Sequence, residues 1–584
     1  MGNFGLEKAS SPRAGLFAFN AMPRWWGRTT LRSLPLGLCG LAIVLTIAAV
    51  LKPILWDEEV YFQFARYIAQ HPLDPYGASI WINGRNFDGF TVLAPPILLY
   101  WWAGAIALFE SNVSLTAIAL FPFALAYTAS FHGLAQRLAP KLALALTVMA
   151  TISAWPLVTI SYMLDFPAAT LELAALALFM AGSGPGRRHW VIAAGLLAGL
   201  AMETKYNAVT IVGAMLLWGL FDRRFFDALL AASVSVLLFC AVETLIRVEY
   251  GQSHFVIHIF SSAPVSNGFI REISRLRELF YGLIQNSGPL AIGILLLYPI
   301  ARGKGRRFIA ANIIFVVAAF ALSAAGFDRI LGYVIPGTTP DRMPMVLSAS
   351  GLLGLAALIY GGCLIGGGSY RQILFNDRRV CFLLAWAILE VLVYFVMSPF
   401  PTARRMGEII AATLLLVGRA VILRGPCAPI GRLVHVQVVI NAICGLTMLA
   451  IALVDGWNVE ATVRSAAAFM RTNAQGGEAW HMTSLGLAHY FDATGIARID
   501  RDVTKLQPGD LLVVDFLDAE RAEVLQASGL QPIATIRAGI NLGVSVSTSF
   551  YRAANPWFAA SDTRPAVVVL RANKPTGIPA DFGG

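Results

Sequence analysis

Long apolar runs separated by short polar segments fill the first 455 residues of the chain. About 20 apolar residues in a helix span a bilayer, and runs of roughly 14 to 24 residues recur through this region. We expect thirteen of them to cross a membrane, beginning at about Leu34, Ser114, Leu142, Phe166, His189, Asn207, Phe226, Leu279, Phe308, Met345, Val380, Gly407 and Leu433. The first is expected to continue from Leu34 to Leu55. This pattern predicts a polytopic α-helical membrane protein.

One further apolar run, Val92 to Phe109, decides on which side every later loop lies. If it does not cross and the N-terminus is inside, the basic loop residues fall on the cytoplasmic side, as the positive-inside rule requires. These residues are Arg137, Lys141, Arg187, Arg188, Arg223, Arg224, Arg302, Lys304, Arg306, Arg307, Arg378, Arg379, Arg424 and Arg432. We therefore expect this run to rest at the outer interface, within an external loop 56–113, and Lys205 to lie outside.

The chain divides into three parts by pattern. Residues 1–33 are expected to form a cytoplasmic tail, and residues 34–455 the transmembrane body. From residue 456 the composition becomes soluble, with expected strands at 509–515, 533–536 and 566–570 and expected helices around 459–472 and 519–528. Strands that alternate with helices indicate a small α/β domain, which the charge pattern places outside the cell membrane, in the periplasm.

Composition supports the membrane assignment and removes several other classes. Hydrophobic residues make up 57% of the chain and charged residues 13%, whereas soluble chains run about 45–50% and about 25%. The net charge of +10 could suggest a nucleic-acid partner, but many of the basic residues sit in short clusters between apolar runs, where they act as orientation signals. The six cysteines show no CxxC spacing, and we expect no bound metal and no cofactor.

Under this topology, ionisable residues converge on the outer face. They include Asp57, Glu58, Glu59, Asp165, Glu203, Lys205, His254, His258, Asp328, Arg329, Asp341, Arg342, Arg404 and Arg405. Any one of them alone is more simply a solvated loop end, or a lysine that snorkels from a helix terminus. Together they indicate a site that binds an anion and activates a hydroxyl, because a carboxylate can accept the proton while cations neutralise a departing phosphate.

The segment Trp56-Asp57-Glu58-Glu59-Val60-Tyr61 resembles the first external loop of bacterial glycosyltransferase family 39-like and aminoarabinose-transferase-like enzymes. Further matches follow in the same order along the chain: Pro95-Pro96, Met163-Leu164-Asp165-Phe166-Pro167, Gly199-Leu200-Ala201 and Thr204-Lys205-Tyr206. These families are GT-C glycosyltransferases that use polyprenyl-phosphate sugars. The resemblance covers nearly the whole chain.

The resemblance implies an inverting transfer of one sugar from a lipid-linked donor to a cell-envelope acceptor, which would be a glycan such as lipopolysaccharide, a lipid or a protein. It implies that Asp57 is the catalytic base with Glu58 beside it, and that Asp165 lies near a substrate sugar. Substrate-binding residues are expected at Tyr61, Lys205, Tyr206, Arg404 and Arg405. The location implied is the bacterial inner membrane, with the active site facing the periplasm.

Two positions depart from the family pattern. Val60 stands where many relatives carry Arg, and Ala94 stands where the aminoarabinose enzymes carry Lys before proline. Recognition of the carrier phosphate is therefore expected to rely on Lys205, Arg404 and Arg405, and aminoarabinose is disfavoured as the sugar.

Two other functions remain open from the residues alone. A transporter or flippase for a lipid-linked sugar would account for Glu172 and Glu390 within expected spans. A membrane sensor would account for the external domain but not for the acids of the first loop. In that domain, His481 and His489 lack metal-ligand spacing, so packing or surface roles are expected for both.

Overall fold

The structure is a computed structural model, and it describes residues 34–109, 112–182, 186–260, 376–397, 402–423, 430–474, 476–483, 485–515, 524, 527–547, 558–559 and 562–578. Three expected spans, beginning at Leu279, Phe308 and Met345, lie outside the described residues, as do most of the expected helix 519–528 and the segment from Asp328 to Arg342.

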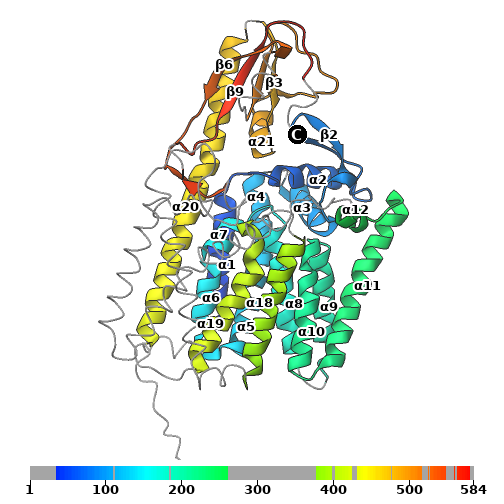
Figure 1. Ribbon diagram of the computed structural model, residues 1–584, viewed down its shortest axis with the longest axis vertical. Helices are drawn as coiled ribbons and strands as arrows, with labels where there is room; N and C mark the ends of the chain where they lie inside the picture. The colour runs from blue at the N-terminus through cyan, green and yellow to red at the C-terminus, as the bar shows by residue number, and fades with distance from the viewer. Residues whose placement is uncertain are drawn as a thin grey trace, which may run out of the picture.

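A bundle of apolar helices forms the larger part of the molecule (Figure 1). Its helices and short 3-10 turns are α1 (Leu34–Leu51), α4 (Val113–Ala117), η2 (Ile118–Leu120), α5 (Phe121–Leu138), η3 (Pro140–Leu142), α6 (Ala143–Thr151), α7 (Ala154–Thr159), α8 (Asp165–Ala181), α9 (Arg188–Met202), η4 (Tyr206–Val209), α10 (Thr210–Phe221), α11 (Phe225–Tyr250), α18 (Arg378–Met397), η5 (Ala403–Met406), α19 (Gly407–Leu423) and α20 (Ile430–Asn473). Ten of the thirteen expected spans coincide with described helices, each of which begins within a few residues of its expected start.

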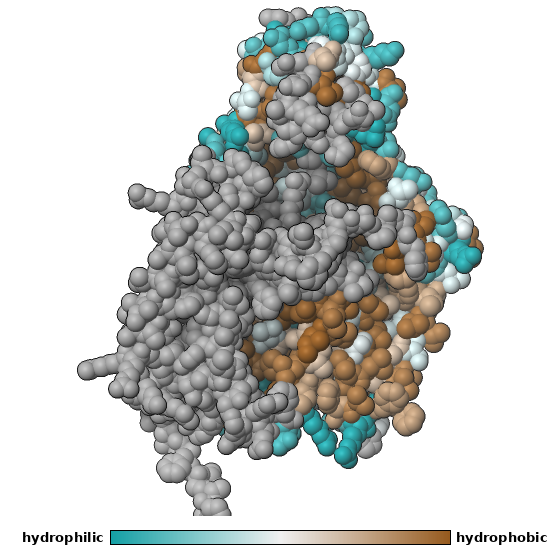
Figure 2. Space-filling view, in the orientation of Figure 1, coloured by the Kyte–Doolittle hydropathy of each residue, from teal (hydrophilic) through white to brown (hydrophobic). Residues whose placement is uncertain are grey.

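Five of the described helical segments are long and apolar enough to cross a membrane. They are Val113–Leu138, Pro140–Thr159, Phe225–Tyr250, Ala403–Leu423 and Gln437–Asn473. Figure 2 shows apolar residues gathered over the helical part of the visible face, with polar residues over the sheet above and at the lower end. The chain is therefore a multi-pass membrane protein, while the total of thirteen crossings stays a prediction.

The first span ends earlier than expected. Helix α1 stops at Leu51 rather than continuing to Leu55, because Pro53 cannot donate a helical hydrogen bond and disfavours the α conformation at Lys52. A short linker, residues 52–57, then leads to α2 (Glu58–Gln70). Asp57 thus belongs to the start of α2 and not to the end of the span.

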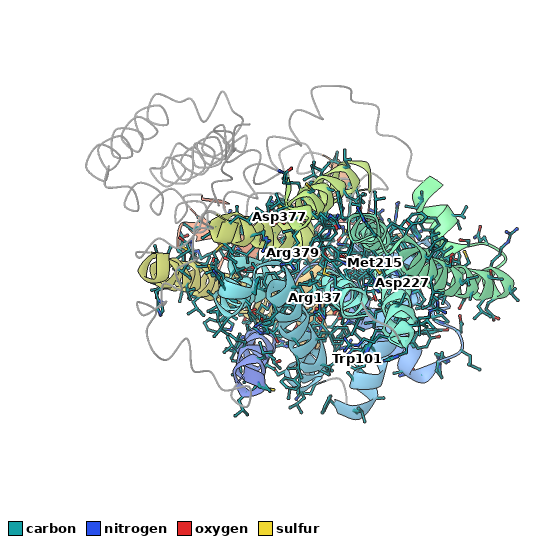
Figure 3. All side chains as sticks on the ribbon, turned by 90° about the horizontal axis from the view of Figure 1, so that it is seen from below. Trp101, Arg137, Met215, Asp227, Asp377 and Arg379 are labelled. Carbon is teal, nitrogen blue, oxygen red and sulfur yellow. The ribbon has the colours of Figure 1, made fainter. Side chains whose placement is uncertain are left out.

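The expected external loop folds over one end of the bundle, which we call the domain end. It contains α2, the hairpin β1 (Ser79–Ile82) and β2 (Arg85–Asp88), η1 (Gly89–Thr91) and α3 (Pro96–Phe109), with α12 (His254–Phe260) beside them. Helix α3 has 14 residues, about 21 Å at 1.5 Å per residue, which is short of the roughly 30 Å hydrocarbon core. Its residue Trp101 lies at the rim of the bundle (Figure 3). That α3 rests at the interface remains a prediction.

The C-terminal region is a mixed sheet of order β4-β3-β5-β9-β6. Its strands are β3 (Ala479–Met482), β4 (Ala497–Arg498), β5 (Leu511–Val514), β6 (Leu530–Ile536) and β9 (Val567–Ala572), with α21 (Leu485–Ala493) and the pair β7 (Val544–Ser545) and β8 (Phe558–Ala559) alongside. Strand β3 is parallel to β4 and β5, and β9 is antiparallel to its two neighbours. The three expected strands are present as β5, β6 and β9.

Helix α20 connects the two parts without a break. Its 44 residues extend about 66 Å, and its last turns pack Val463, Ala467 and Met470 against one face of the sheet. The change in composition at residue 456 therefore falls inside a helix and not in a linker.

Candidate active site

Asp57 and Arg404 meet at the domain end of the bundle. Asp57 precedes α2, directly after Trp56, whose φ of 50° is an unusual left-handed conformation for a large residue. Arg404 lies in η5, where its Nη1 donates to Asp57 Oδ2 at 3.0 Å. The arginine side chain is only 8% exposed, whereas that of Asp57 is 37% exposed. The carboxylate is thus held from the protein side and remains open on the other.

Asp165 and Lys205 form a second pair next to the first. Asp165 opens α8, and Lys205 lies between α9 and η4, where its Nζ donates to Asp165 Oδ1. Arg404 Nε lies 4.0 Å from the other oxygen of Asp165. Helix α8 has Leu164 as its N-cap residue, with no side-chain cap bond, so Asp165 does not cap the helix. Four residues from four separate segments of the chain therefore form one charged group.

Backbone contacts fix Arg404 in this position. Trp155 Nε1 donates to the carbonyl oxygen of Arg404 at 2.9 Å. Thr402 is the N-cap residue of η5. Its hydroxyl accepts a hydrogen bond from the backbone N–H of Arg404, and its own N–H donates to Tyr394 Oη at 2.8 Å. The turn that carries the arginine is thus attached to α7 on one side and to α18 on the other.

Tyr61 and Arg405 complete the group. Tyr61 lies one turn after Asp57 on α2, and burial, followed by the charge of Asp57, raises the pKa of its hydroxyl well above the ordinary range. The hydroxyl therefore stays neutral. Arg405 lies close enough to Asp165 to act on its charge. With Arg404, Arg405 and Lys205 against Asp57 and Asp165, three cations and two carboxylates leave one net positive charge, which suits a bound phosphate.

Glu58, expected beside the catalytic base, faces the linker instead. Its Oε2 accepts from the N–H of Leu55 at 2.7 Å, and the residue is 2% exposed. Nearby, Lys52 Nζ donates to the carbonyl oxygen of Val158 at 2.8 Å. Burial lowers the pKa of Lys52 to about 7, with the charge of Glu58 acting in the opposite direction.

Tyr206 belongs to a different buried group. Its hydroxyl donates to Glu243 Oε1 at 3.0 Å and lies 2.6 Å from His254 Nδ1. The ring of His254 stacks on that of Tyr76, with 4.7 Å between the centroids. The structure thus brings together Asp57, Asp165, Lys205, Arg404, Tyr61 and Arg405, and it places Glu58 and Tyr206 elsewhere.

The contacts of Glu59, Arg498 and the hairpin were not expected from the sequence. Glu59 is 1% exposed and binds both Arg498 and His489 of the C-terminal domain. The hairpin had a local signal, because Asn83 and Gly84, with φ of 50° and 81°, form the Asn-Gly turn favoured between paired strands. The pairing of Glu59 with Arg498 had none, since 439 positions separate them.

No bound metal was expected from the sequence. Among the residues that the structure describes, no three His, Cys, Asp or Glu side chains are grouped so as to hold a metal ion. Metal independence of the reaction stays a prediction.

Comparisons with known proteins give likenesses among solved structures alone. No family model matches, and no curated protein matches. The chain is similar to ArnT from Cupriavidus metallidurans in the apo state, at 16% identity and a TM-score of 0.42, over 92% of this chain and 97% of that one. It is similar to the oligosaccharyltransferase AglB from Archaeoglobus fulgidus, in complex with an inhibitory peptide and a dolichol-phosphate, at 13% identity and a TM-score of 0.43, over 80% and 64%.

A third likeness is to the arabinosyltransferase EmbB from Mycobacterium smegmatis, at 14% identity and a TM-score of 0.30, over 92% of this chain and 48% of that one. Because each TM-score lies below 0.5, the case for a function rests on the side chains of this protein.

Proposed function

We propose that the protein is an inverting membrane glycosyltransferase that moves one sugar from a polyprenyl-phosphate donor to a cell-envelope glycan, lipid or protein. The observation that carries the proposal is the partly exposed carboxylate of Asp57, 3.0 Å from Arg404 and next to the Asp165–Lys205 pair. A base open to solvent and a set of cations are what this transfer requires at one place.

In the proposed reaction, an acceptor hydroxyl attacks the anomeric carbon from the face opposite the phosphate. Asp57 takes the hydroxyl proton, the new C–O bond forms, and the bond from the anomeric carbon to the phosphate oxygen breaks with its electron pair on the phosphate. Arg404, Arg405 and Lys205 neutralise the leaving phosphate. Asp165 holds Lys205 and Arg404 in place and orients a substrate hydroxyl. A single displacement of this kind inverts the anomeric configuration.

The arrangement of basic residues supports a periplasmic site in an inner membrane. Arg137, Arg379 and the Asp377 region lie at the end of the bundle that faces the viewer in Figure 3, opposite the domain end. The positive-inside rule assigns the end rich in loop arginines to the cytoplasm. Asp57 and the C-terminal sheet then lie outside, where lipid-linked sugars meet envelope acceptors.

The decisive experiment is transfer by purified protein with a polyprenyl-phosphate sugar as donor. Asp57→Asn keeps the shape of the side chain but removes the base, so turnover should fall by about 100- to 10,000-fold while donor binding stays near that of the wild type. Asp377→Asn, at the opposite end of the bundle, is the control and should retain turnover. Ordinary turnover of Asp57→Asn would move the base to another carboxylate, with Asp165 next to test. Chelator should leave the wild-type rate unchanged.

The transporter or flippase interpretation rests on carboxylates inside the bundle. Glu172 accepts from Thr210 Oγ1 at 3.1 Å and Glu390 accepts from Trp386 Nε1 at 2.8 Å, and both residues are buried. The two functions separate in vesicles, because a flippase moves the intact lipid-linked sugar across the bilayer whereas a transferase consumes it.

A further inference from the structure

The linker that carries Asp57 is held on its outer side by the C-terminal domain. Glu59, two residues after Asp57, is 1% exposed and has a partner at each oxygen. Oε1 accepts from Arg498 Nη2 at 2.9 Å, and Oε2 lies 2.7 Å from His489 Nδ1. Asp57 and Glu59 thus face different partners, with Asp57 on the bundle and Glu59 on the domain.

Arg498 is held rigidly before it reaches Glu59. Its Nε donates to both carboxylate oxygens of Asp492, at 2.9 and 3.1 Å, and its guanidinium lies 4.8 Å from the centre of the Trp81 ring. Burial alone would raise the pKa of Asp492, but hydrogen bonds from His481 and Arg498 lower it to about 2. The arginine is thus fixed by a carboxylate that is ionised at every physiological pH.

Close backbone packing adds a contact that involves no charge. A Cβ on Gly486, at the start of α21, would come within 2.8 Å of Leu55 Cα and 3.1 Å of the Trp56 nitrogen. Tyr490, on the same helix, bonds to the backbone of Ile54. Helix α21 therefore rests directly on the residues that precede Asp57, including the strained Trp56.

The hairpin of the external loop makes a third attachment to the domain. Trp81 Nε1 donates to the carbonyl oxygen of Ile499 at 2.9 Å, and the N–H of Arg501 donates to the carbonyl oxygen of Gly84 at 2.9 Å. These contacts adjoin Arg498, so the sheet edge, the hairpin and α2 form one continuous interface.

We propose that Arg498 and Glu59 are positioning residues, and that the docked C-terminal domain sets the placement of Asp57 against Arg404. The inference rests on the proposed role of Asp57 as the base. If the Glu59–Arg498 contact is lost, the domain holds the linker 52–57 and the start of α2 less tightly, through α21 and the hairpin, and Asp57 samples positions away from the acceptor. A misplacement of about 1 Å can cost about 100-fold in rate.

The test uses the full-length protein with Glu59→Gln and Arg498→Gln, each alone. Each variant should lower kcat by about 10- to 100-fold with KM nearly unchanged, and should speed hydrogen–deuterium exchange of the peptide that covers residues 52–62. Arg498→Lys keeps the charge and should restore part of the rate. The matched control is Arg564→Gln, which breaks another Arg–Asp pair of the same domain and should change neither measurement.

A variant of Gly486 tests the same inference without removing a charge. Gly486→Ala pushes on Leu55 and Trp56 and should lower kcat in the same way even if the Arg498 variants fold poorly. In an Asp57→Asn background, Arg498→Gln should not lower the residual turnover any further, because both changes act through the same carboxylate.

The outcomes separate this inference from the proposed function. Ordinary turnover of Asp57→Asn overturns the role of the base and the positioning role with it, although faster exchange at 52–62 would still report the mechanical contact. A large loss with Asp57→Asn, together with unchanged kcat in Glu59→Gln, Arg498→Gln and Gly486→Ala, overturns the positioning inference alone. Further loss from Arg498→Gln in the Asp57→Asn background also overturns it.

Discussion

An arginine lies near each end of the α19 segment, and each arginine pairs with an aspartate, but the two pairs are built differently. Asp377 Oδ1 accepts from the N–H groups of Arg379 and Val380, in the first turn of α18, and Oδ2 accepts from Arg419 Nε at 3.2 Å. Both side chains of that pair are 14% exposed. At the other end, Arg404 is buried, and the side-chain carboxylate of Asp57 meets no other hydrogen-bond donor among the described residues and is 37% exposed.

The contrast separates the Asp377–Arg419 pair, which stabilises the fold, from the Asp57–Arg404 pair, which belongs to the candidate site. Asp377 has its hydrogen-bonding capacity taken up by a helix N-terminus and one arginine, so it has little left to offer a ligand. Asp57 stands where further cations and a second carboxylate converge and where solvent has access. The two Asp–Arg pairs contain the same residue types, but Asp57 keeps hydrogen-bonding capacity that Asp377 has used. This unused capacity marks the domain end of the bundle as the functional one.

The largest effect that would sharpen the comparison comes from the two arginines. Arg404→Gln removes a cation from the leaving phosphate and should lower turnover by about 100- to 1,000-fold. Arg419→Gln should leave the rate per folded molecule unchanged and lower the melting temperature instead. Comparable rate losses in both folded variants would erase the distinction between the two ends.

A smaller rate effect is expected at Asp165. Asp165→Asn keeps the shape of the residue but loses the charge that Lys205 and Arg404 share, so turnover should fall by about 10- to 100-fold in a protein that stays folded. Circular dichroism and single-turnover transfer check the two parts. Unchanged turnover would reduce Asp165 to a helix-end residue without a role in the reaction.

The Asp377–Arg419 pair should make the stability of the protein depend on pH. Burial alone would raise the pKa of Asp377, but Arg419 and two backbone N–H groups lower it below its ordinary value. A carboxyl whose folded pKa is lowered stabilises the fold above its unfolded pKa of about 4, and this contribution is lost as the pH falls through the folded value. Asp377→Asn should therefore lower the melting temperature at pH 7, and the difference from wild type should shrink below about pH 4. A difference independent of pH would contradict the ionic origin.

The smallest change to the protein tests on which side of the membrane each end of the bundle lies. Single cysteines at positions 205 and 419, in a cysteine-free background, should react from opposite sides of the membrane, with position 205 open to an impermeant reagent added outside. Position 205 labelled exclusively by reagent that reaches the cytoplasm would overturn the topology, and with it the interfacial placement of α3.

The sequence predicted the helical body well, because a run of apolar residues predicts a membrane helix without any knowledge of the segments that pack against it. The convergence of Asp57, Asp165, Lys205 and Arg404 was also expected, since the positive-inside rule placed the loops that carry them on one side of the membrane. The orientation of each acid was not, because Glu58 and Asp57 are neighbours with equal charge, and their partners are the N–H of Leu55 and the side chain of Arg404. The pairing of Asp57 with Arg404 depends on packing between segments that are 347 residues apart, and a single sequence gives no signal for it.

The unbroken course of α20 also determines how the domain can be isolated. Asp455, one residue before the composition change, accepts at Oδ2 from the N–H groups of Val546 and Ser547 and from the hydroxyl of Ser545. A fragment begun at residue 456 would leave those three donors without their acceptor and would cut the helix on which the sheet is laid. A well-folded soluble fragment must therefore begin upstream of Asp455, inside the apolar stretch, with its lipid-facing residues replaced by polar ones.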